Sequence, residues 1–258
     1  MTGDAPGRAV IITGGTSGVG LATARRLAVD GDTRIALIGR NTERGKDACS
    51  AVRAVAPDCD VHFVAGDAND PAQAVEAATS ARDLLGGVDV LINSTTAFYT
   101  PTLLRDVPVS DIGAVLTGQA LAPMHMCRIV LPWLAAAGAG AIVNVASDAA
   151  KVPTPGEVVI GAAMAAIVTF TRTLAVEAKR DGIRVNAVTP SLIEGTLTGE
   201  RAMAGGFSKK LFEKAKQQAH LGPTEVDDLA ELIAFLTGPG SAKITGQVVS
   251  VNGGISVA

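Results

Sequence analysis

Features that mark several protein classes are scarce in this sequence. No uninterrupted apolar run reaches the roughly 18 residues of a transmembrane helix, so we expect no membrane span. The formal net charge of -3 gives no basic surface for nucleic acid or for an anionic membrane. The segment from Met1 to Arg8 lacks the basic and apolar regions of a secretory signal. We therefore expect a protein that binds neither nucleic acid nor membrane.

Cysteine and tyrosine are also rare. Cys49, Cys59 and Cys127 lie far apart and without metal-ligand spacing, which argues against a disulfide framework and against a metal site. We interpret them as reduced cysteines of a cytoplasmic protein. Tyr99 is the only tyrosine, and the residue four positions later is Leu103, so the chain contains no Tyr-x-x-x-Lys pair.

The sequence does contain a regular alternation of apolar runs and amphipathic stretches. Strands are predicted at 9–13, 34–38, 60–65, 88–93, 141–146, 184–189 and 247–251. Helices are predicted at 18–30, 43–56, 71–85, 111–136, 160–180 and 227–236, with Pro123 and Pro132 as kinks or breaks in the fourth. This order predicts an α/β fold, one parallel sheet of about seven strands with helices on both faces, in a single domain over 1–258. Residues 191–206 are Gly-rich and irregular, and we expect them to form a lid over a substrate.

A glycine-rich turn lies between the first strand and the first helix. The pattern Thr13-Gly14-x-x-x-Gly18-x-Gly20 permits a tight turn and lets the backbone approach a pyrophosphate. The free N–H groups at the helix start then bind that anion. We expect these residues of the turn to contact a dinucleotide: Gly14, Thr16, Ser17, Gly18, Val19 and Gly20.

The ends of the later strands complete the expected cofactor site. The second strand ends in Gly39-Arg40 and lacks the acid that holds an unphosphorylated ribose, so Arg40 favours NADP(H) over NAD(H). Asp67 is placed to accept a hydrogen bond from the adenine amino group, and the backbone of Asn93 to flank the ribose. The other expected contacts are Ala68, Pro190 and Ile193.

Four further motifs complete a resemblance to one family. They are Gly-Asp-Ala-Asn-Asp at 66–70, Ile-Val-Asn-Val-Ala-Ser at 142–147, Gly-Ile-Arg-Val-Asn-Ala-Val-Thr-Pro at 182–190, and the ending at 244–254. Together with the glycine-rich turn, they resemble the short-chain dehydrogenase/reductase family from about Arg8 to Gly254. The resemblance implies a Rossmann-type doubly wound domain, a bound NAD(P)(H) and a homotetramer.

The resemblance fails where the family's catalytic residues are expected. Ser147 matches the family's Ser, but Ile160 and Met164 stand where the resemblance places Tyr and Lys, and Val115 stands where it places Asn. Hydride delivery to a ketone builds an alkoxide that needs a proton. Neither Ile nor Met donates one, and loss of a general acid costs about 10²–10⁴ in rate. The usual family mechanism is therefore disfavoured.

Three functions remain open. The first is an NADP(H)-dependent oxidoreductase with a non-standard site that reduces a conjugated C=C or a carbonyl of an apolar, acyl-thioester-like substrate, with Ser147, Tyr99 and Lys151 as candidate catalytic residues. The second is a pseudoenzyme that binds cofactor and assembles with a catalytic paralogue. The third is a non-redox isomerase, cyclase or dehydratase. We interpret Asp148 and Glu157 as solvated loop charges.

Overall fold

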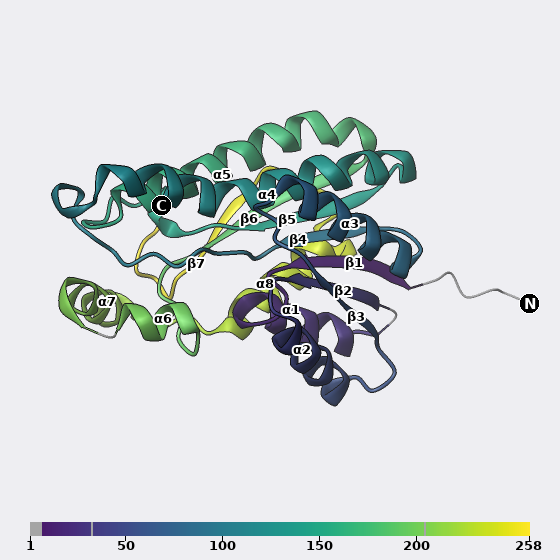
Figure 1. Ribbon diagram of the computed structural model, residues 1–258, viewed down its shortest axis with the longest axis horizontal. Helices are drawn as coiled ribbons and strands as arrows, with labels where there is room; N and C mark the ends of the chain where they lie inside the picture. Colours follow the sequence, from purple (N-terminus) through teal and green to yellow (C-terminus); the bar gives the residue numbers. More distant parts are fainter. Residues whose placement is uncertain (1–6, 32, 204) are drawn as a thin grey trace, which may run out of the picture.

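The computed structural model describes residues 7–31, 33–203 and 205–258. Its centre is a seven-stranded parallel sheet in the order β3-β2-β1-β4-β5-β6-β7 (Figure 1). The apolar runs form these strands because both faces of the sheet are covered by helices. The strands are β1 (Arg8–Thr13), β2 (Thr33–Gly39), β3 (Asp60–Ala65), β4 (Val90–Asn93), β5 (Gly140–Val145), β6 (Ile183–Pro190) and β7 (Val248–Val251).

The helices cover the two faces of the sheet in two groups (Figure 1). One face carries α3 (Pro71–Leu85), α4 (Val109–Ala137) and α5 (Val158–Ala178), and the other carries α1 (Gly18–Val29), α2 (Thr42–Val55) and α8 (Val226–Thr237). Each group closes its own apolar core against the sheet. Short 3-10 turns complete these connections: η1 (Leu104–Asp106), η2 (Asp148–Ala150), η3 (Lys179–Asp181) and η4 (Pro239–Ser241). The predicted doubly wound α/β fold is confirmed.

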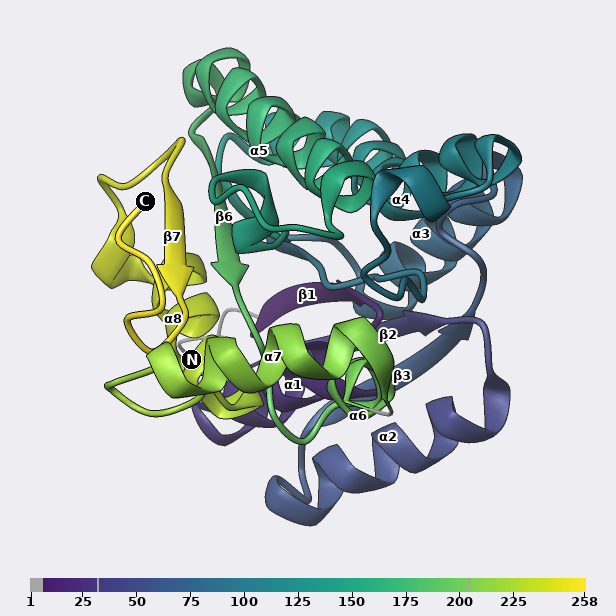
Figure 2. The same cartoon turned by 90° about the vertical axis from the view of Figure 1, so that its left-hand side faces the viewer.

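Two helices lie beyond the carboxyl ends of the strands rather than on a face. They are α6 (Leu197–Ala202) and α7 (Gly206–Gln218), which face the viewer in Figure 2. β4 lies on the opposite side of β1 from β2, so the chain reverses direction across the sheet between β1 and β4. Open α/β sheets bind ligands outside the carboxyl ends of their strands at such a switch point. The fold therefore places the site under α6 and α7.

The predicted strands and helices are all present, with bounds that differ by at most two residues. Two expectations need correction. α4 is not broken at Pro123 or Pro132, because its packing against α3 and α5 outweighs the lost backbone hydrogen bonds. The segment expected to be irregular contains α6, and α7 follows it directly. Phe207, Leu211 and Ala215 recur at helical spacing and could have revealed α7.

By length and composition, α4 and α5 are apolar enough to cross a membrane. Both instead pack on the sheet and on each other, and their buried apolar side chains belong to the core of that face or to a small cluster beside it. Their apolar character is explained by this core, together with exposed apolar residues that include Val109, Val158 and Val176.

Candidate active site

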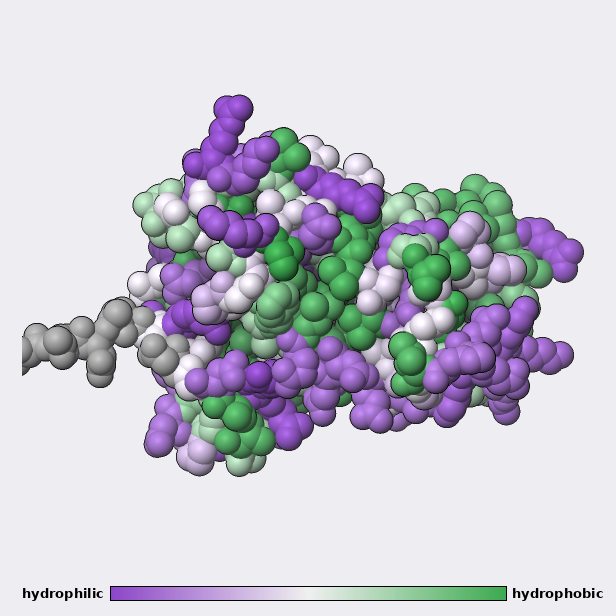
Figure 3. Space-filling model, turned by 180° about the vertical axis from the view of Figure 1, so that it is seen from behind, coloured by the Kyte–Doolittle hydropathy of each residue, from purple (hydrophilic) through white to green (hydrophobic). Residues whose placement is uncertain are grey.

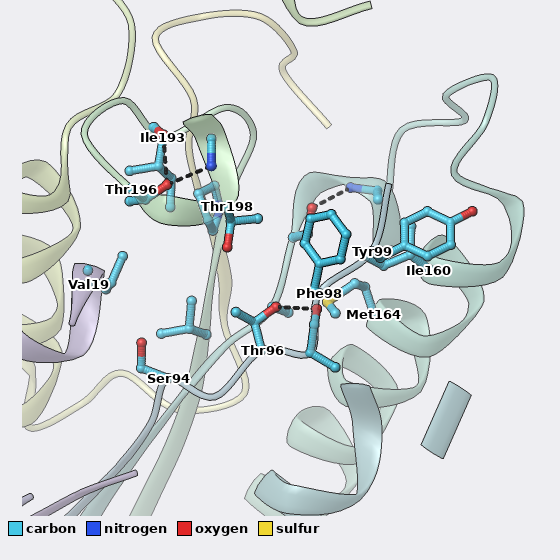
Figure 4. Close-up of a pocket in the computed structure, with 18 of the residues that line it drawn as sticks. Val19, Ser94, Thr96, Phe98, Tyr99, Ile160, Met164, Ile193, Thr196 and Thr198 are labelled. Carbon is cyan, nitrogen blue, oxygen red and sulfur yellow. Dashed lines mark hydrogen bonds between the residues drawn. The ribbon is translucent and has the colours of Figure 1, made fainter. Parts of the chain in front are cut away.

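A cavity of about 760 Å³ opens at the carboxyl ends of the strands. Residues after β1, β2, β3, β4, β5 and β6 line it, and α6 and α7 contribute its outer wall. Figure 4 shows side chains from these separate segments turned toward one space. The sequence expectation that residues 191–206 cover a site is consistent with this arrangement, although α6 gives the segment a regular part.

The start of α1 forms one end of the cavity. Ser17 is the N-cap residue, yet its side chain makes no capping hydrogen bond, so the first N–H groups of the helix have no side-chain acceptor. Gly18 has a φ of +51°, and a Cβ there would meet only Thr196 Cγ2, at 3.8 Å. The lack of a side chain keeps the backbone open to the cavity. Free N–H groups at a helix start, approached over glycine, suit a diphosphate, so the residues present fit a dinucleotide.

Two arginines stand where β2 ends. Arg40 is exposed and forms an ion pair with Asp67 at 3.7 Å. Arg44, in the first turn of α2, also lines the cavity, and sequence reasoning missed it. Gly39 has a close neighbour, since a Cβ there would lie 2.9 Å from Thr16 Cγ2. An acidic side chain at position 39 would therefore displace Thr16. With glycine at this position, the charged side chains that line the cavity next to the end of β2 are Arg40 and Arg44.

Most of the cofactor residues expected from the sequence come together here. Those that line the cavity are Gly14, Thr16, Ser17, Gly18, Val19, Arg40, Asp67, Ala68, Pro190 and Ile193. Gly20 and Asn93 do not. Gly20 lies against the turn, where a Cβ would be 2.4 Å from Gly14 O. Asn93 is buried, and its amide bonds Thr13 Oγ1 and Asn144 Oδ1, both at 2.9 Å. Ser94, one residue later, lines the cavity instead.

Ser147 follows β5 and lines the cavity. Its Oγ accepts a hydrogen bond from the backbone N–H of Ala149 at 3.2 Å, which fixes the side chain at the start of η2. That bond uses a lone pair of the oxygen and leaves the O–H group able to donate. The Ser147 hydroxyl is therefore held at the cavity with its O–H group free to donate.

Tyr99 contributes its ring to the cavity, whereas its hydroxyl is engaged elsewhere. The O–H donates to Gly156 O at 2.9 Å, and in Figure 4 it points away from Ser94 and Thr96. Burial raises the pKa of Tyr99, and the neighbouring Glu157 carboxyl adds to the rise. Both effects make Tyr99 a poorer acid, and the geometry gives it a role in the wall.

Lys151 does not line the cavity within the described residues. Its ammonium group donates to Ser250 Oγ and lies 3.5 Å from Asp148 Oδ1, with both charged side chains almost fully buried. Asp148 also accepts from Asn252 and Ser256, near the end of the chain. The interpretation of Asp148 as a solvated charge was wrong, because this network encloses it. Lys151 fastens the C-terminal residues to η2 rather than pointing at a ligand.

Ile160 and Met164 form an apolar wall of the cavity (Figure 4). Both lie on α5, where Met164 is buried in a small apolar cluster that Ile160 packs against. Val115 does not line the cavity. One turn later on α4, the buried Gln119 donates to Ala97 O at 2.7 Å and accepts from Ala97 N, which holds the loop after β4 in place. Apolar side chains of α5 therefore line this end of the cavity, and the contact between Gln119 and Ala97 frames it.

The outer end of the cavity is apolar with a cationic rim. Thr196 caps α6 by accepting from Gly199 N at 3.0 Å. On this helix, the guanidinium of Arg201 lies over the Phe98 ring at 5.1 Å, within cation–π range. Lys214 joins it on the rim from α7. The apolar lining here consists of Phe98, Leu197, Leu211 and Phe212.

Comparisons with known proteins agree with this geometry. The family model described as enoyl-(acyl carrier protein) reductase matches residues 14–256. The 3-oxoacyl-[acyl-carrier-protein] reductase FabG of Thermotoga maritima is 30% identical over 258 residues, covering 97% of this chain and 98% of its own. The solved structure of levodione reductase matches with a TM-score of 0.90 at 29% identity, covering 96% of each chain.

Two further solved structures carry nicotinamide cofactors. NAD+-bound xylitol dehydrogenase has a TM-score of 0.87 at 27% identity and covers 98% of this chain and 100% of its own. An actinorhodin polyketide ketoreductase variant with NADPH has a TM-score of 0.88 at 25% identity and covers 96% of this chain and 97% of its own. The family model, the relative at 30% identity and the structural match all indicate the same family. The chain belongs to the short-chain dehydrogenase/reductase family of nicotinamide-dependent oxidoreductases.

Proposed function

We propose that the protein is an NADP(H)-dependent reductase with a non-standard active site that acts on a carbonyl or a conjugated C=C of an apolar, acyl-thioester-like substrate. One observation carries this proposal: a single cavity joins an open helix N-terminus at Gly18 to an apolar end that holds Ser147. A dinucleotide fits the first end, and an uncharged reacting group fits the second.

The preference for NADP(H) rests on the charges after β2. Arg40 and Arg44 both line the cavity, and Asp67 is the acidic side chain paired with Arg40. Guanidinium groups bind a ribose 2′-phosphate through forked hydrogen bonds, whereas an NAD site needs an acid where Gly39 stands. An acid at position 39 would have to displace the Thr16 side chain, because a Cβ there would lie 2.9 Å from Thr16 Cγ2.

The substrate class rests on the outer end of the cavity. Its aromatic and aliphatic lining favours an acyl chain, and the rim cations Arg201 and Lys214 complement a phosphate on a thioester arm. Two of the names found by comparison, the enoyl and 3-oxoacyl reductases of acyl carrier proteins, concern substrates of this kind.

When bound, the reduced nicotinamide supplies a hydride. The chain's own residues then act on the substrate. The hydroxyl of Ser147 donates to the oxygen on which negative charge develops, and such a donor contributes most where water is absent. Ile160 and Met164 make the wall beside Ser147 apolar, which lowers the local polarity around the developing charge.

The first test is titration with NADPH and NADH, followed by fluorescence. We expect wild type to prefer NADPH, and Arg40→Ala and Arg44→Ala each to weaken NADPH binding by tenfold or more, since a charge-assisted bond contributes about 1.5–3 kcal/mol. Arg25→Ala is the control, because Arg25 is exposed on α1 and does not line the cavity. Equal affinity for both nucleotides, unchanged by the arginine substitutions, would refute the cofactor assignment.

The second test follows NADPH consumption with 3-oxoacyl and 2-enoyl thioesters of increasing chain length. Stoichiometric consumption that improves with chain length supports the proposal. Tight NADPH binding without turnover would favour the pseudoenzyme, and product formed without oxidation of the cofactor would favour non-redox chemistry.

We further propose a cytoplasmic homotetramer, with a mixed assembly containing a catalytic paralogue as the alternative. Exposed apolar side chains on α4 and α5 support association: Val109, Val158 and Val176 are 86%, 55% and 61% exposed. Figure 3 shows hydrophobic residues at the surface of the face opposite to that in Figure 1, interspersed with hydrophilic ones. Light scattering at micromolar concentration tests this, and a monomer would overturn it.

A further inference from the structure

Glu157 occupies an unexpected place in the cavity. It is the N-cap residue of α5, three positions before Ile160 and seven before Met164. Residues at these spacings share one face of a helix, and all three side chains line the cavity, as does Ser147. Glu157 therefore precedes by one helical turn the position at which the family resemblance places a tyrosine, and the two positions share the cavity.

Two aromatic residues from distant segments contact Gly156, the residue before Glu157. The hydroxyl of Tyr99 donates to Gly156 O, and Thr102 N–H donates to the same oxygen at 2.8 Å. From the other side, Phe207 of α7 packs over Gly156 so closely that a Cβ there would lie 2.6 Å from its ring. Glu157 is thus partly enclosed, and the interpretation of it as a solvated loop charge was wrong.

The charges around Glu157 do not neutralise it. It takes part in none of the ion pairs formed among the described residues. Asp148 is held by Lys151, Arg201 lies over Phe98, and Lys214 stands on the rim. Burial raises the pKa of Glu157, and the neighbouring Thr154 side chain offsets part of the rise. A carboxyl group that is buried and lacks a cation favours its neutral, proton-carrying form.

We propose that Glu157 donates the proton that completes reduction in this cavity, in place of the hydroxyl that Ile160 lacks. This role rests on the proposed function. The substrate carbon gains a hydride from the reduced nicotinamide, and the carbonyl π electrons move to oxygen. The O–H bond of the Glu157 carboxyl group breaks as the new O–H bond forms on that oxygen. The nicotinamide ends oxidised, and water at the partly exposed side of Glu157 restores its proton.

Competing donors are less suited. The proton of Tyr99 is committed to Gly156 O, and the ammonium of Lys151 is committed to Ser250 and Asp148. Ser147 stabilises the developing oxyanion, but an aliphatic hydroxyl is a much weaker acid than a carboxyl group and so a poorer proton donor. Glu157 combines a place in the cavity with an acidity moved toward the operating pH, which is what general acid catalysis requires.

The experiment compares wild type with Glu157→Gln, Glu157→Asp and the matched control Glu177→Gln, an exposed glutamate on the same helix. We expect Glu157→Gln to bind NADPH as wild type does and to lose about 10²–10⁴ in kcat. Glu157→Asp should retain part of kcat, and Glu177→Gln all of it. Wild-type kcat should fall as the pH rises through the pKa of Glu157. The pH–rate profile of Glu157→Gln should lack this fall. NADPH affinity serves as the folding control.

A second readout does not depend on turnover. In protein labelled with 13C at the glutamate carboxyl carbons, the signal lost in Glu157→Gln reports the titration of this residue, and we expect its pKa above the ordinary glutamate value. An ordinary value, or a kcat and pH profile unchanged in Glu157→Gln, would overturn the role of Glu157 alone. A wild type without turnover on any substrate would overturn the proposed function, and this role with it.

Discussion

The glycines of the turn after β1 allow a stability prediction with an internal control. Gly14 and Gly31 have nearly the same left-handed φ, +70° and +75°. A Cβ at Gly31 would meet no atom within 4 Å, whereas one at Gly14 would lie 2.4 Å from Ser94 O and 2.7 Å from Ser94 C. Alanine at the two positions therefore shares one conformational cost, and alanine at Gly14 adds a collision with the end of β4.

The magnitudes follow from these two costs. A left-handed φ costs a residue with a Cβ about 1–2 kcal/mol, which sets the expected loss for Gly31→Ala. Overpacking adds about 1–3 kcal/mol, so Gly14→Ala should lose about 2–5 kcal/mol in all. At about 2–4 °C per kcal/mol for a chain of this size, the Tm should fall clearly further for Gly14→Ala.

Gly18→Ala separates binding from stability. Its φ is +51° and its nearest neighbour is 3.8 Å away, so its stability should match that of Gly31→Ala. Its methyl group, however, would project over the start of α1, where the pyrophosphate is expected, and NADPH affinity should fall at least tenfold. Urea unfolding measures the stability of the three variants, and NADPH fluorescence measures their affinity for the cofactor. A Gly14→Ala protein as stable as Gly31→Ala, or a Gly18→Ala protein with wild-type affinity, would refute this reasoning.

Three further predictions concern a helix cap, a thiol and an arginine. Asp70 caps α3 by accepting from Gln73 N at 2.9 Å, so Asp70→Ala should lose about 1 kcal/mol in urea unfolding; Ser17→Ala, at a cap without such a bond, should lose little stability. Burial raises the pKa of the Cys127 thiol from 9.0 to about 12. A disulfide reagent should therefore modify Cys59 before Cys127 in the native protein. Modification in the reverse order would contradict this prediction. The folded state favours the neutral Cys127 thiol more than the unfolded state does. The stability that this preference contributes is complete below pH 9.0 and is lost as the pH rises toward about 12. The Arg184 guanidinium donates to Leu236 O and Gly238 O at the end of α8 and to Ser241 Oγ, at 2.7–3.2 Å. Arg184→Met should lose about 2–4 kcal/mol, and wild-type stability would contradict this.

The fold could be predicted from the sequence because its signals are local. A buried parallel strand is a short apolar run, and a covering helix is an amphipathic stretch, so each element is visible within its own residues. Bounds shifted by one or two residues where caps such as Asn41 or Gly138 decide the end. α7 was missed because the two glycines at 205–206 and several lysines obscured its apolar spacing.

The site was only partly predictable because its decisive contacts join distant residues. The conformation of the glycine-rich turn is determined by its own residues, and most of the cofactor residues expected from the sequence do line the cavity. Tyr99 and Lys151, by contrast, were judged by residue type and sequence position. The partners that engage them, Gly156 and Ser250, lie 57 and 99 residues away in the sequence. Glu157 stands among prolines and glycines in the sequence, and only Tyr99 and Phe207 reveal that it is enclosed.

The carbonyl group of Gly156 ties these contacts together. It accepts from Tyr99 and from Thr102, and the same residue packs against Phe207 of α7. The three segments that enclose Glu157 therefore meet at one residue, whose φ of +85° favours glycine. Because burial is the main cause of the raised Glu157 pKa, any movement of α7 away from Gly156 would wet the carboxyl group and make it a stronger acid that is ionised before it can donate.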